Sequence, residues 1–515
     1  MEIIRKISNQ MIGRKTGCAD NKIIKKRVPI LLAIASCVVI QAQVIKVAID
    51  TSLVKHTMRG GMGASWHAIN QEFPLNNDEY EIPIREIGSR GSAYGGNPPI
   101  QYKQAWEQLK SHASWLGINF IRVELSQRMY EPQKGKFDFE NEEMQALFNI
   151  LDWAESNGAD VFLQQMWMNV PWNSFPGIHP LLSAPKNLDD YAIGITTLIE
   201  FLTKEKGYSC IKYFCMTNEP PGGTWGYWWE YGGNKGNIED AWARLNKEFE
   251  IRGINIPISG PDWTDMPTFD ESKLGFSKYL GAIDIHSYHG VTAEGEENLK
   301  KWATWTHQTG KPFFLTEYGN MDLGWGGSDP NQKSFEAALS NANDVLRAMR
   351  AGVDGFNRWS FTNRGDLDGQ WQLVKTYDLN TKKYLQKVLP ENEAYYGFGI
   401  ISRFLSKYSS VVSCESSSDD STFLCNAVVS PDKKTTIFLL NKSSENVEIE
   451  LNFTSQIQGF YLYEVTKKIV NEPDFKLEPI ETFSGKKIKF TLKPNSINTL
   501  SQNYISANDA GVVLN

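Results

Sequence analysis

The chain has 515 residues, which leaves room for an α/β barrel of about 250 residues or more and for a companion domain. Its net charge of −7 argues against nucleic acid or an anionic membrane surface as the main partner, because such partners need clustered lysine and arginine. The 16 tryptophans and 20 tyrosines favour carbohydrate, since aromatic faces stack on sugar rings, although a large domain also buries tryptophan in its core.

Residues 1–42 have the pattern of a signal peptide. Basic residues between positions 22 and 27 precede the apolar run Val28–Ile40, and Gln41-Ala42 ends the run at a plausible cleavage point. This run is too short for a permanent transmembrane helix. We therefore expect a secreted, periplasmic or cell-surface protein with no permanent transmembrane anchor. The segment 34–37 also resembles a lipobox, so lipoprotein anchoring through Cys37 stays open.

Strand-like and helix-like segments alternate between residues 58 and 405. The predicted strands are 61–67, 117–125, 159–166, 211–219, 254–259, 282–288, 311–317 and 352–360. The helices predicted between them include 102–116, 144–154, 188–206, 242–251 and 335–351. Eight strand–helix repeats are what a closed (β/α)₈ barrel contains, so we predict this α/β fold for residues 58–405.

The pattern changes after residue 405 to short runs that alternate with period two. Examples are 436–440, 447–451 and 487–492, and they predict an antiparallel β-sandwich over residues 406–515. Residues 43–57 form one or two strands with no helix to follow, so we expect them to join that sandwich. Cys414 and Cys425 flank a Ser/Asp-rich turn, and whether they form a disulfide in an oxidising compartment is left open.

Two predicted strands each deliver a glutamate at the last position. The apolar run Ile211–Met216 leads into Asn218, Glu219 and Pro220, and the strand that begins at residue 311 ends in Glu317. Active sites of parallel α/β folds lie at the C-terminal edge of the sheet, so a closed barrel would bring the two glutamates together across its mouth. Such a carboxyl pair is the arrangement that cleaves glycosidic bonds.

Polar and aromatic residues on other strands are further candidates. Arg122 on the second strand is expected to point into the barrel, where it needs a partner. His286 and Tyr288 share one face of the sixth strand. Candidates for substrate binding at other strand ends and in the aromatic loop after Glu219 are Trp66, His67, Trp167 and Trp225, with a core role for Trp66 as an equal alternative. No Cys/His spacing resembles a metal site, so we predict neither a metal nor another cofactor.

These residues resemble the pattern of clan A of the glycoside hydrolases, which are retaining enzymes on a (β/α)₈ barrel. The clan has Asn-Glu after strand four, Glu after strand seven, Arg on strand two, His-x-Tyr on strand six and Trp on strand eight. The matching residues here are Asn218, Glu219, Glu317, Arg122, His286, Tyr288 and Trp359. With residues 395–404 and a sandwich behind the barrel, the chain looks most like family 30 and less like families 39, 51 and 5. The long insertion before the first helix and the aromatic loop after Glu219 depart from the pattern, so the resemblance leaves the substrate open.

The resemblance implies a double displacement on a β-linked poly- or oligosaccharide, with Glu219 as acid/base and Glu317 as nucleophile. Arg122 and Tyr288 would hold Glu317 ionised. Asn218 would bind the sugar 2-hydroxyl, and Trp359 would form the floor of that subsite. We expect a monomer with no nucleic-acid partner. A transglycosylase would keep every one of these residues, whereas a non-catalytic surface glycan-binding protein predicts the loss of one carboxylate, and both are present.

Overall fold

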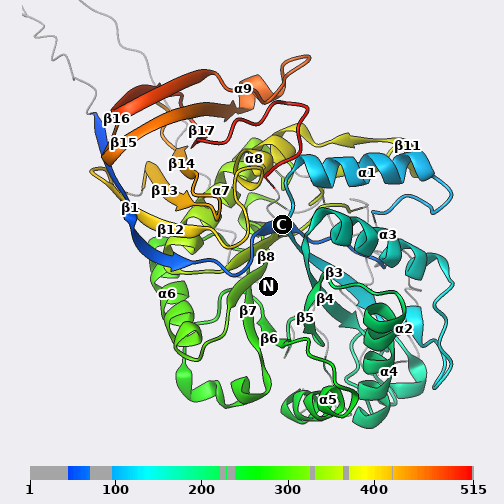
Figure 1. Cartoon of the computed structure of the whole chain (residues 1–515). Coiled ribbons are helices and arrows are strands. Elements are labelled where there is room, and N and C mark those ends of the chain that lie inside the picture. Colours follow the sequence, from blue (N-terminus) through cyan, green and yellow to red (C-terminus); the bar gives the residue numbers. More distant parts are fainter. Residues whose placement is uncertain are drawn as a thin grey trace, which may run out of the picture. The chain divides into compact units, whose positions relative to one another are not determined.

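Eight parallel strands form a barrel, which confirms the predicted fold (Figure 1). In chain order the strands are β2 (Met62–Ala64), β3 (Phe120–Ser126), β4 (Asp160–Trp167), β5 (Ile211–Cys215), β6 (Ile258–Trp263), β7 (Ala282–Ser287), β8 (Phe313–Tyr318) and β9 (Gly355–Arg358). They are hydrogen-bonded in the order β2-β9-β8-β7-β6-β5-β4-β3. Backbone hydrogen bonds of 2.9 Å from Trp66 to Arg122 and from Ala68 to Glu124 join the two ends of this sheet and close the ring.

This computed structural model describes residues 44–69, 80, 96–220, 228, 238–324, 331–363, 370–419 and 421–512. The predicted signal peptide with Cys37, and the candidate Trp225, lie outside the described residues. Within the described part of the chain, no helix has both the length and the apolar character needed to cross a membrane.

Helices follow the strands, as the alternation predicted. The longer ones are α1 (Lys103–Trp115), α3 (Glu142–Asn157), α4 (Leu188–Glu200), α5 (Ile238–Arg252), α6 (Ala293–Gln308), α7 (Phe335–Ala351) and α8 (Asn392–Ser402). The shorter ones are α2 (Gln127–Tyr130), α9 (Lys467–Val470), the π-helix η3 (Phe201–Glu205) and the 3₁₀ turns η2 (Pro171–Asn173), η5 (Glu271–Lys273), η6 (Gly275–Tyr279) and η7 (Met321–Leu323). The helix predicted over 188–206 is therefore α4 followed by a π turn.

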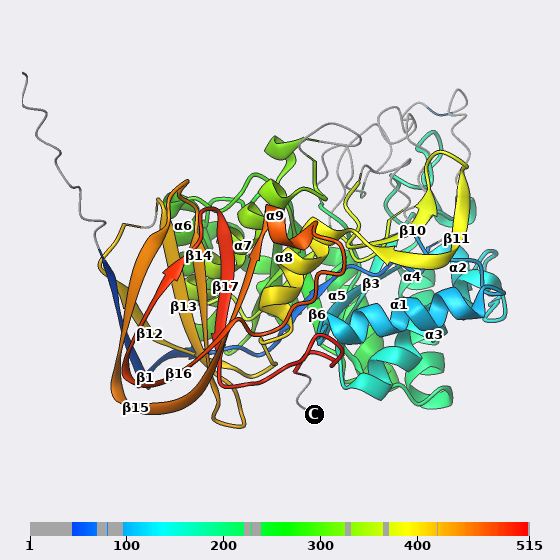
Figure 2. The ribbon, with the colours of Figure 1, turned by 90° about the horizontal axis from the view of Figure 1, so that it is seen from above.

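A second sheet forms the predicted sandwich. Its strands are β1 (Ile45–Thr57), β12 (Ser410–Ser416), β13 (Phe423–Val429), β14 (Thr435–Asn441), β15 (Val447–Thr466), β16 (Glu481–Leu492) and β17 (Ser496–Ser501), paired in the order β1-β12-β13-β14-β17-β15-β16. β1 is antiparallel to β12 and parallel to the first part of β15, so the N-terminal strand joins the sandwich as expected. β15 then bends, and its last residues pair with β17 (Figure 2).

The sandwich and the barrel belong to one compact unit. α7 and α8 contact both, and the Asn426 side chain of β13 donates a 2.6 Å hydrogen bond to the Leu346 carbonyl of α7. A separate hairpin of β10 (Val374–Asp378) and β11 (Lys383–Pro390) packs along α1. Cys414 and Cys425, whose pairing was left open, are both free thiols.

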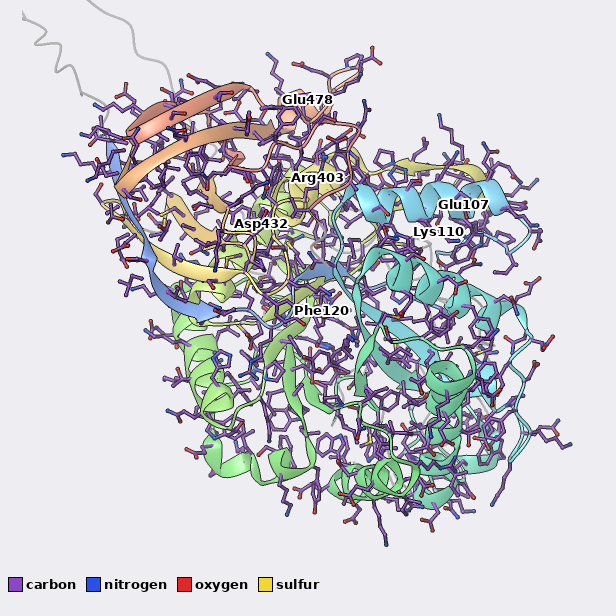
Figure 3. All side chains as sticks on the ribbon, viewed as in Figure 1. Glu107, Lys110, Phe120, Arg403, Asp432 and Glu478 are labelled. Carbon is purple, nitrogen blue, oxygen red and sulfur yellow. The ribbon has the colours of Figure 1, made fainter. Side chains whose placement is uncertain are left out.

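The barrel interior changes from apolar to polar along its axis. Phe120, labelled in Figure 3, forms a buried cluster with Phe162, Cys215, Ala282 and Phe314 inside the ring of strands. Side chains of a strand alternate between its two faces, so Arg122 and Glu124 follow Phe120 into the interior, and both are completely buried. The apolar layer therefore lies beneath a layer of buried charges at the C-terminal edge of the sheet.

Candidate active site

The two glutamates predicted at strand ends meet inside the mouth of the barrel. Glu219 follows β5 and Glu317 lies in β8, and a carboxylate oxygen of one is within 4.8 Å of a carboxylate oxygen of the other. Glu219 is 7% exposed and Glu317 4% exposed. Such a close approach of two oxygens is expected of retaining glycosidases, whose carboxyl groups lie about 5 to 5.5 Å apart, whereas those of inverting enzymes lie about 6.5 to 9.5 Å apart.

An irregular backbone lets Asn218 and Glu219 both reach the interior. In a regular strand these neighbours would point to opposite faces. β5 ends at Cys215, however, and Glu219 adopts a left-handed φ of 47°. The side-chain oxygen Oδ1 of Asn218 accepts hydrogen bonds from Arg122 at 2.8 Å and from Gln164 at 3.3 Å, which fixes the orientation of the side-chain amide.

Two donors hold the Glu317 carboxylate. The Arg122 guanidinium donates to one oxygen of Glu317 and also to Glu124, and the Tyr288 hydroxyl donates to the other oxygen of Glu317. Burial raises the pKa of Glu317 to about 7, even though the charges of Arg122 and His286 lower it. Its ionised form therefore becomes the main form only above about pH 7 in the free protein.

His286 lies between the two glutamates and a third carboxylate. Its Nδ1 is 2.9 Å from Glu219 Oε1 and 3.3 Å from Glu317 Oε2, and its Nε2 is 2.9 Å from Asp262 Oδ1. Burial lowers the pKa of this imidazole, but the charges of Glu317 and Asp262 raise it well above the ordinary value. His286 can therefore donate a hydrogen bond to each side.

Two buried carboxylates of this network, Glu124 and Asp262, are absent from the set predicted from sequence. Glu124 was detectable, because it lies two residues after Arg122 and so shares its inward face. Asp262 was harder to find, since the predicted fifth strand stopped at residue 259. In the structure β6 continues through Pro261 to Trp263, and Asp262 takes a left-handed φ of 59° there. A strand that runs into Gly-Pro-Asp was the one available signal.

The aromatic candidates separate into two groups. The Trp359 ring lies 4.7 Å from the His67 ring and 5.8 Å from the Arg122 guanidinium, measured from the Trp359 ring centroid, and His67 Nδ1 is hydrogen-bonded to Glu124. Trp66 lies beyond the end of β2 and is completely buried. Its ring packs 4.8 Å from that of Phe361, which favours the core alternative, and a substrate role for Trp66 stays a prediction.

The structure says less about the roles of the remaining tryptophan candidates. Trp167 is completely buried at the C-terminal end of β4, at the same edge of the sheet as the glutamates, and its role stays a prediction. Trp225 lies outside the described residues.

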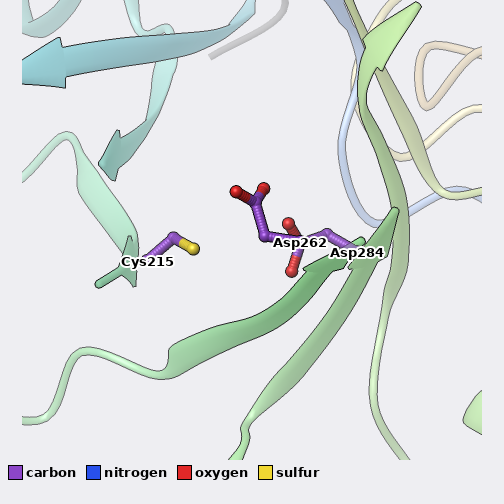
Figure 4. A group of neighbouring side chains, drawn as sticks. All are labelled: Cys215, Asp262 and Asp284. Carbon is purple, nitrogen blue, oxygen red and sulfur yellow. The ribbon is translucent and has the colours of Figure 1, made fainter. Parts of the chain in front are cut away.

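Two clusters in the described residues bring together atoms that can ligate a metal. One consists of Glu219, His286 and Glu317, and the other of Cys215, Asp262 and Asp284 (Figure 4). Protein donors already occupy the carboxylates of both clusters. Ser259 and Thr316, for example, donate to Asp284 at 2.8 and 3.1 Å. We therefore assign neither cluster as a metal site.

Two family models match parts of the chain. A family model described as cellulase (glycosyl hydrolase family 5) matches residues 77–365, and one for the glycosyl hydrolase family 30 beta sandwich domain matches residues 409–500. No curated protein matches the chain.

Solved structures with the same architecture share little sequence with this chain. A conserved exported protein from Bacteroides fragilis has a TM-score of 0.64 at 15% identity, covering 89% of this chain and 100% of that one. The glycoside hydrolase family 30 subfamily 8 xylanase Xyn30A from Clostridium acetobutylicum has a TM-score of 0.59 at 14% identity, covering 88% and 99%. The endo-beta1,6-glucanase BT3312 has a TM-score of 0.60 at 15% identity, covering 88% and 94%. These similarities show the fold.

Proposed function

The chain belongs to the cellulase family, glycosyl hydrolase family 5 in clan A of the retaining glycosidases, and on that premise we propose that it hydrolyses β-linked glycosidic bonds of an oligo- or polysaccharide. The observation that carries the proposal is the pair of buried carboxylates with unlike partners. Glu317 accepts hydrogen bonds from Arg122 and Tyr288, whereas Glu219 faces His286. These two donors offset part of the effect of burial on the pKa of Glu317, and so support the ionised form that a nucleophile requires.

The proposed reaction has two steps. In the first, Glu317 attacks the anomeric carbon while Glu219 gives its proton to the departing oxygen, which leaves a glycosyl ester on Glu317. In the second, Glu219 as a carboxylate takes a proton from water, the water oxygen bonds to the anomeric carbon, and the ester breaks. Glu219 ends with its proton restored and Glu317 ends as a carboxylate.

Neighbouring side chains would bind the attacked sugar. The Asn218 amide, fixed through its oxygen by Arg122, is the proposed donor to the sugar 2-hydroxyl, a hydrogen bond that strengthens in the transition state. Trp359, 5% exposed beside His67, is the proposed platform for the ring of the same sugar.

The proposal extends to location and assembly. The basic and apolar pattern of residues 1–42 supports export, with attachment through Cys37 as the alternative to release. We propose a monomer as the working species. Similar solved structures include xylanases and an endo-beta1,6-glucanase, so xylan and β-1,6-glucan are the first polymers to test.

Single substitutions at the two glutamates test the proposal. Glu317→Ala and Glu219→Ala should each abolish hydrolysis of an unactivated β-glycoside. Added azide should restore turnover of a 2,4-dinitrophenyl β-glycoside by Glu219→Ala, and the product should be the β-glycosyl azide, because azide replaces water in the second step. Glu107→Ala, on an exposed face of α1, is the matched control and should behave as wild type.

The product distribution completes this test. Chromatography of the products distinguishes hydrolysis from transfer to a second sugar, which the same residues would also support. Near-normal turnover by Glu317→Ala would exclude the proposed nucleophile.

A further inference from the structure

We propose that Asp262 and Asp284 form a positioning pair behind the acid/base: Asp262, as an anion, orients His286 and keeps it charged for Glu219, while Asp284 carries the proton that the pair shares. This inference rests on the proposed role of Glu219. Asp262 acts through its hydrogen bonds with His286 and with the Glu219 backbone N–H, and Asp284 acts through the neighbouring Asp262.

The contacts of Asp262 are those of an anion. It is completely buried, and its Oδ1 lies 2.9 Å from His286 Nε2. Its Oδ2 accepts hydrogen bonds from the Gln164 side chain at 2.8 Å and from the Glu219 backbone N–H at 3.3 Å, and it lies 3.8 Å from the Arg122 guanidinium. Burial raises the pKa of Asp262, but the charge and hydrogen bond of His286 and the charge of Arg122 bring it below the ordinary value.

The contacts of Asp284 are those of a neutral acid. It lies two residues before His286 on β7, and its partners Ser259 and Thr316 are hydroxyls, which can accept as well as donate. Carboxylate oxygens of Asp262 and Asp284 lie within 4.8 Å of each other in a fully buried site, where two anions would repel (Figure 4). Burial, and then the nearby charge of Asp262, raise the pKa of Asp284 well above its ordinary value.

The charge of His286 depends on all the groups that face it. These groups are Glu219, Asp262, Asp265, Asp284, Tyr288 and Glu317. Asp262 is the one hydrogen-bonded to Nε2, so its negative charge stabilises the proton on that nitrogen directly. The opposite nitrogen, Nδ1, then points at Glu219 as a donor.

This arrangement matters when Glu219 gives up its proton. Glu219 becomes a carboxylate in a buried site, and an imidazolium 2.9 Å away can donate a hydrogen bond to it. A neutral imidazole with its lone pair on Nδ1 would oppose the same charge. Asp262 therefore assists proton donation to the leaving group without contacting the sugar.

The dependence of the rate on the leaving group tests the proposal. A 2,4-dinitrophenolate can depart without receiving a proton, whereas the oxygen of an unactivated glycoside must be protonated as it departs. Asp262→Asn should lower kcat/KM for an unactivated β-glycoside by about 100-fold, the lower range for general acid catalysis, and change it by less than about threefold for the 2,4-dinitrophenyl β-glycoside. Both values are compared on the pH plateau above the acid limb of each enzyme, because loss of the His286 charge also raises the pKa of Glu317. Asp284→Asn replaces a neutral acid with a neutral amide, so the ratio of the two kcat/KM values should stay within about threefold of the wild-type ratio. Asp344→Asn, at an equally buried aspartate of α7 that accepts from the Val291 N–H, is the structural control for both variants.

Nitrogen-15 NMR of the histidine rings provides a second readout that needs no activity. At pH 7 the wild type should show both nitrogens of His286 protonated, whereas Asp262→Asn should show a neutral ring. An equal loss with both leaving groups, or a His286 ring still doubly protonated in Asp262→Asn, would overturn the proposal. If Asp284→Asn lost as much activity on the unactivated glycoside as Asp262→Asn, the assignment of the proton to Asp284 would be wrong. A wild-type chain inactive on every glycoside would refute the proposed function, and the NMR result would still decide the role of Asp262.

Discussion

The Tyr288 hydroxyl provides a direct test of how Glu317 is kept ionised. Tyr288→Phe removes one donor to this carboxylate and leaves Arg122 in place. A hydrogen bond to a charged group contributes about 1.5–3 kcal/mol, and one pKa unit corresponds to about 1.4 kcal/mol, so the pKa of Glu317 should rise by roughly one to two units. From about 7 in the wild type it should reach about 8–9 in the variant.

The sign of the effect follows from the reaction. Only ionised Glu317 attacks, so kcat/KM should rise with pH through the pKa of Glu317, near 7 in the wild type. At pH 7 about half of the wild-type carboxyls are ionised, against roughly one in ten to one in a hundred in Tyr288→Phe. We therefore expect a loss of roughly 5- to 50-fold at pH 7 that is largely recovered near pH 9.

The assay is kcat/KM for a 2,4-dinitrophenyl β-glycoside between pH 5 and pH 10, because this substrate needs no proton from Glu219. Thermal unfolding over the same range identifies any pH at which the variant is unfolded. If the acid limb of Tyr288→Phe coincided with that of the wild type, the hydroxyl would not stabilise the charge. A wild-type limb near pH 4.5 would mean that Arg122 and His286 outweigh burial at Glu317.

Two further substitutions separate substrate binding from packing. Asn218→Ala should lower kcat/KM by roughly 10- to 100-fold for a glycoside with a 2-hydroxyl and by much less for its 2-deoxy analogue, because the variant loses the hydrogen bond to that hydroxyl. Equal losses on both substrates would exclude this contact. Trp66→Ala should reduce the free energy of unfolding in urea by about 3–5 kcal/mol while KM changes less than twofold, because the ring packs on Phe361 in the core. A large rise in KM with unchanged stability would instead indicate that Trp66 contacts the substrate.

Regular periodicity made most of the fold predictable from the sequence. Residues 335–351 were predicted as a helix and form α7 with the same ends, because Ser334 caps its first turn and Gly352 ends it at a φ of 102°. The inward direction of Arg122 followed from the period-two alternation of its strand. The sequence also predicted that residues 43–57 join the sandwich, because no helix follows them to complete a strand–helix repeat. In the structure β1 pairs with β12 and β15 of the sandwich.

Irregular strand ends were not predictable in the same way. Periodicity assigns Glu219 the face opposite to Asn218, and it cannot assign Asp262 any face once a proline interrupts the strand. At Glu317 the β7–β8 register shifts, so that Thr316 and Glu317 both turn inward, Thr316 to Asp284 and Glu317 to Tyr288. The departures from regular geometry therefore coincide with the acidic residues of the site.

This coincidence has a physical reason. A left-handed φ at a non-glycine residue costs about 1–3 kcal/mol, and both Glu219 and Asp262 adopt one. A regular strand would avoid that cost but would turn the carboxylate of Glu219 toward the apolar layer between strands and helices, where an unpaired charge is far more expensive. The inward position gives Glu219 and Asp262 the same partner, His286, at 2.9 Å from each. Removing that shared imidazole, for example with His286→Leu, should therefore destabilise the fold as well as the reaction, because it leaves two buried carboxylates without their common donor.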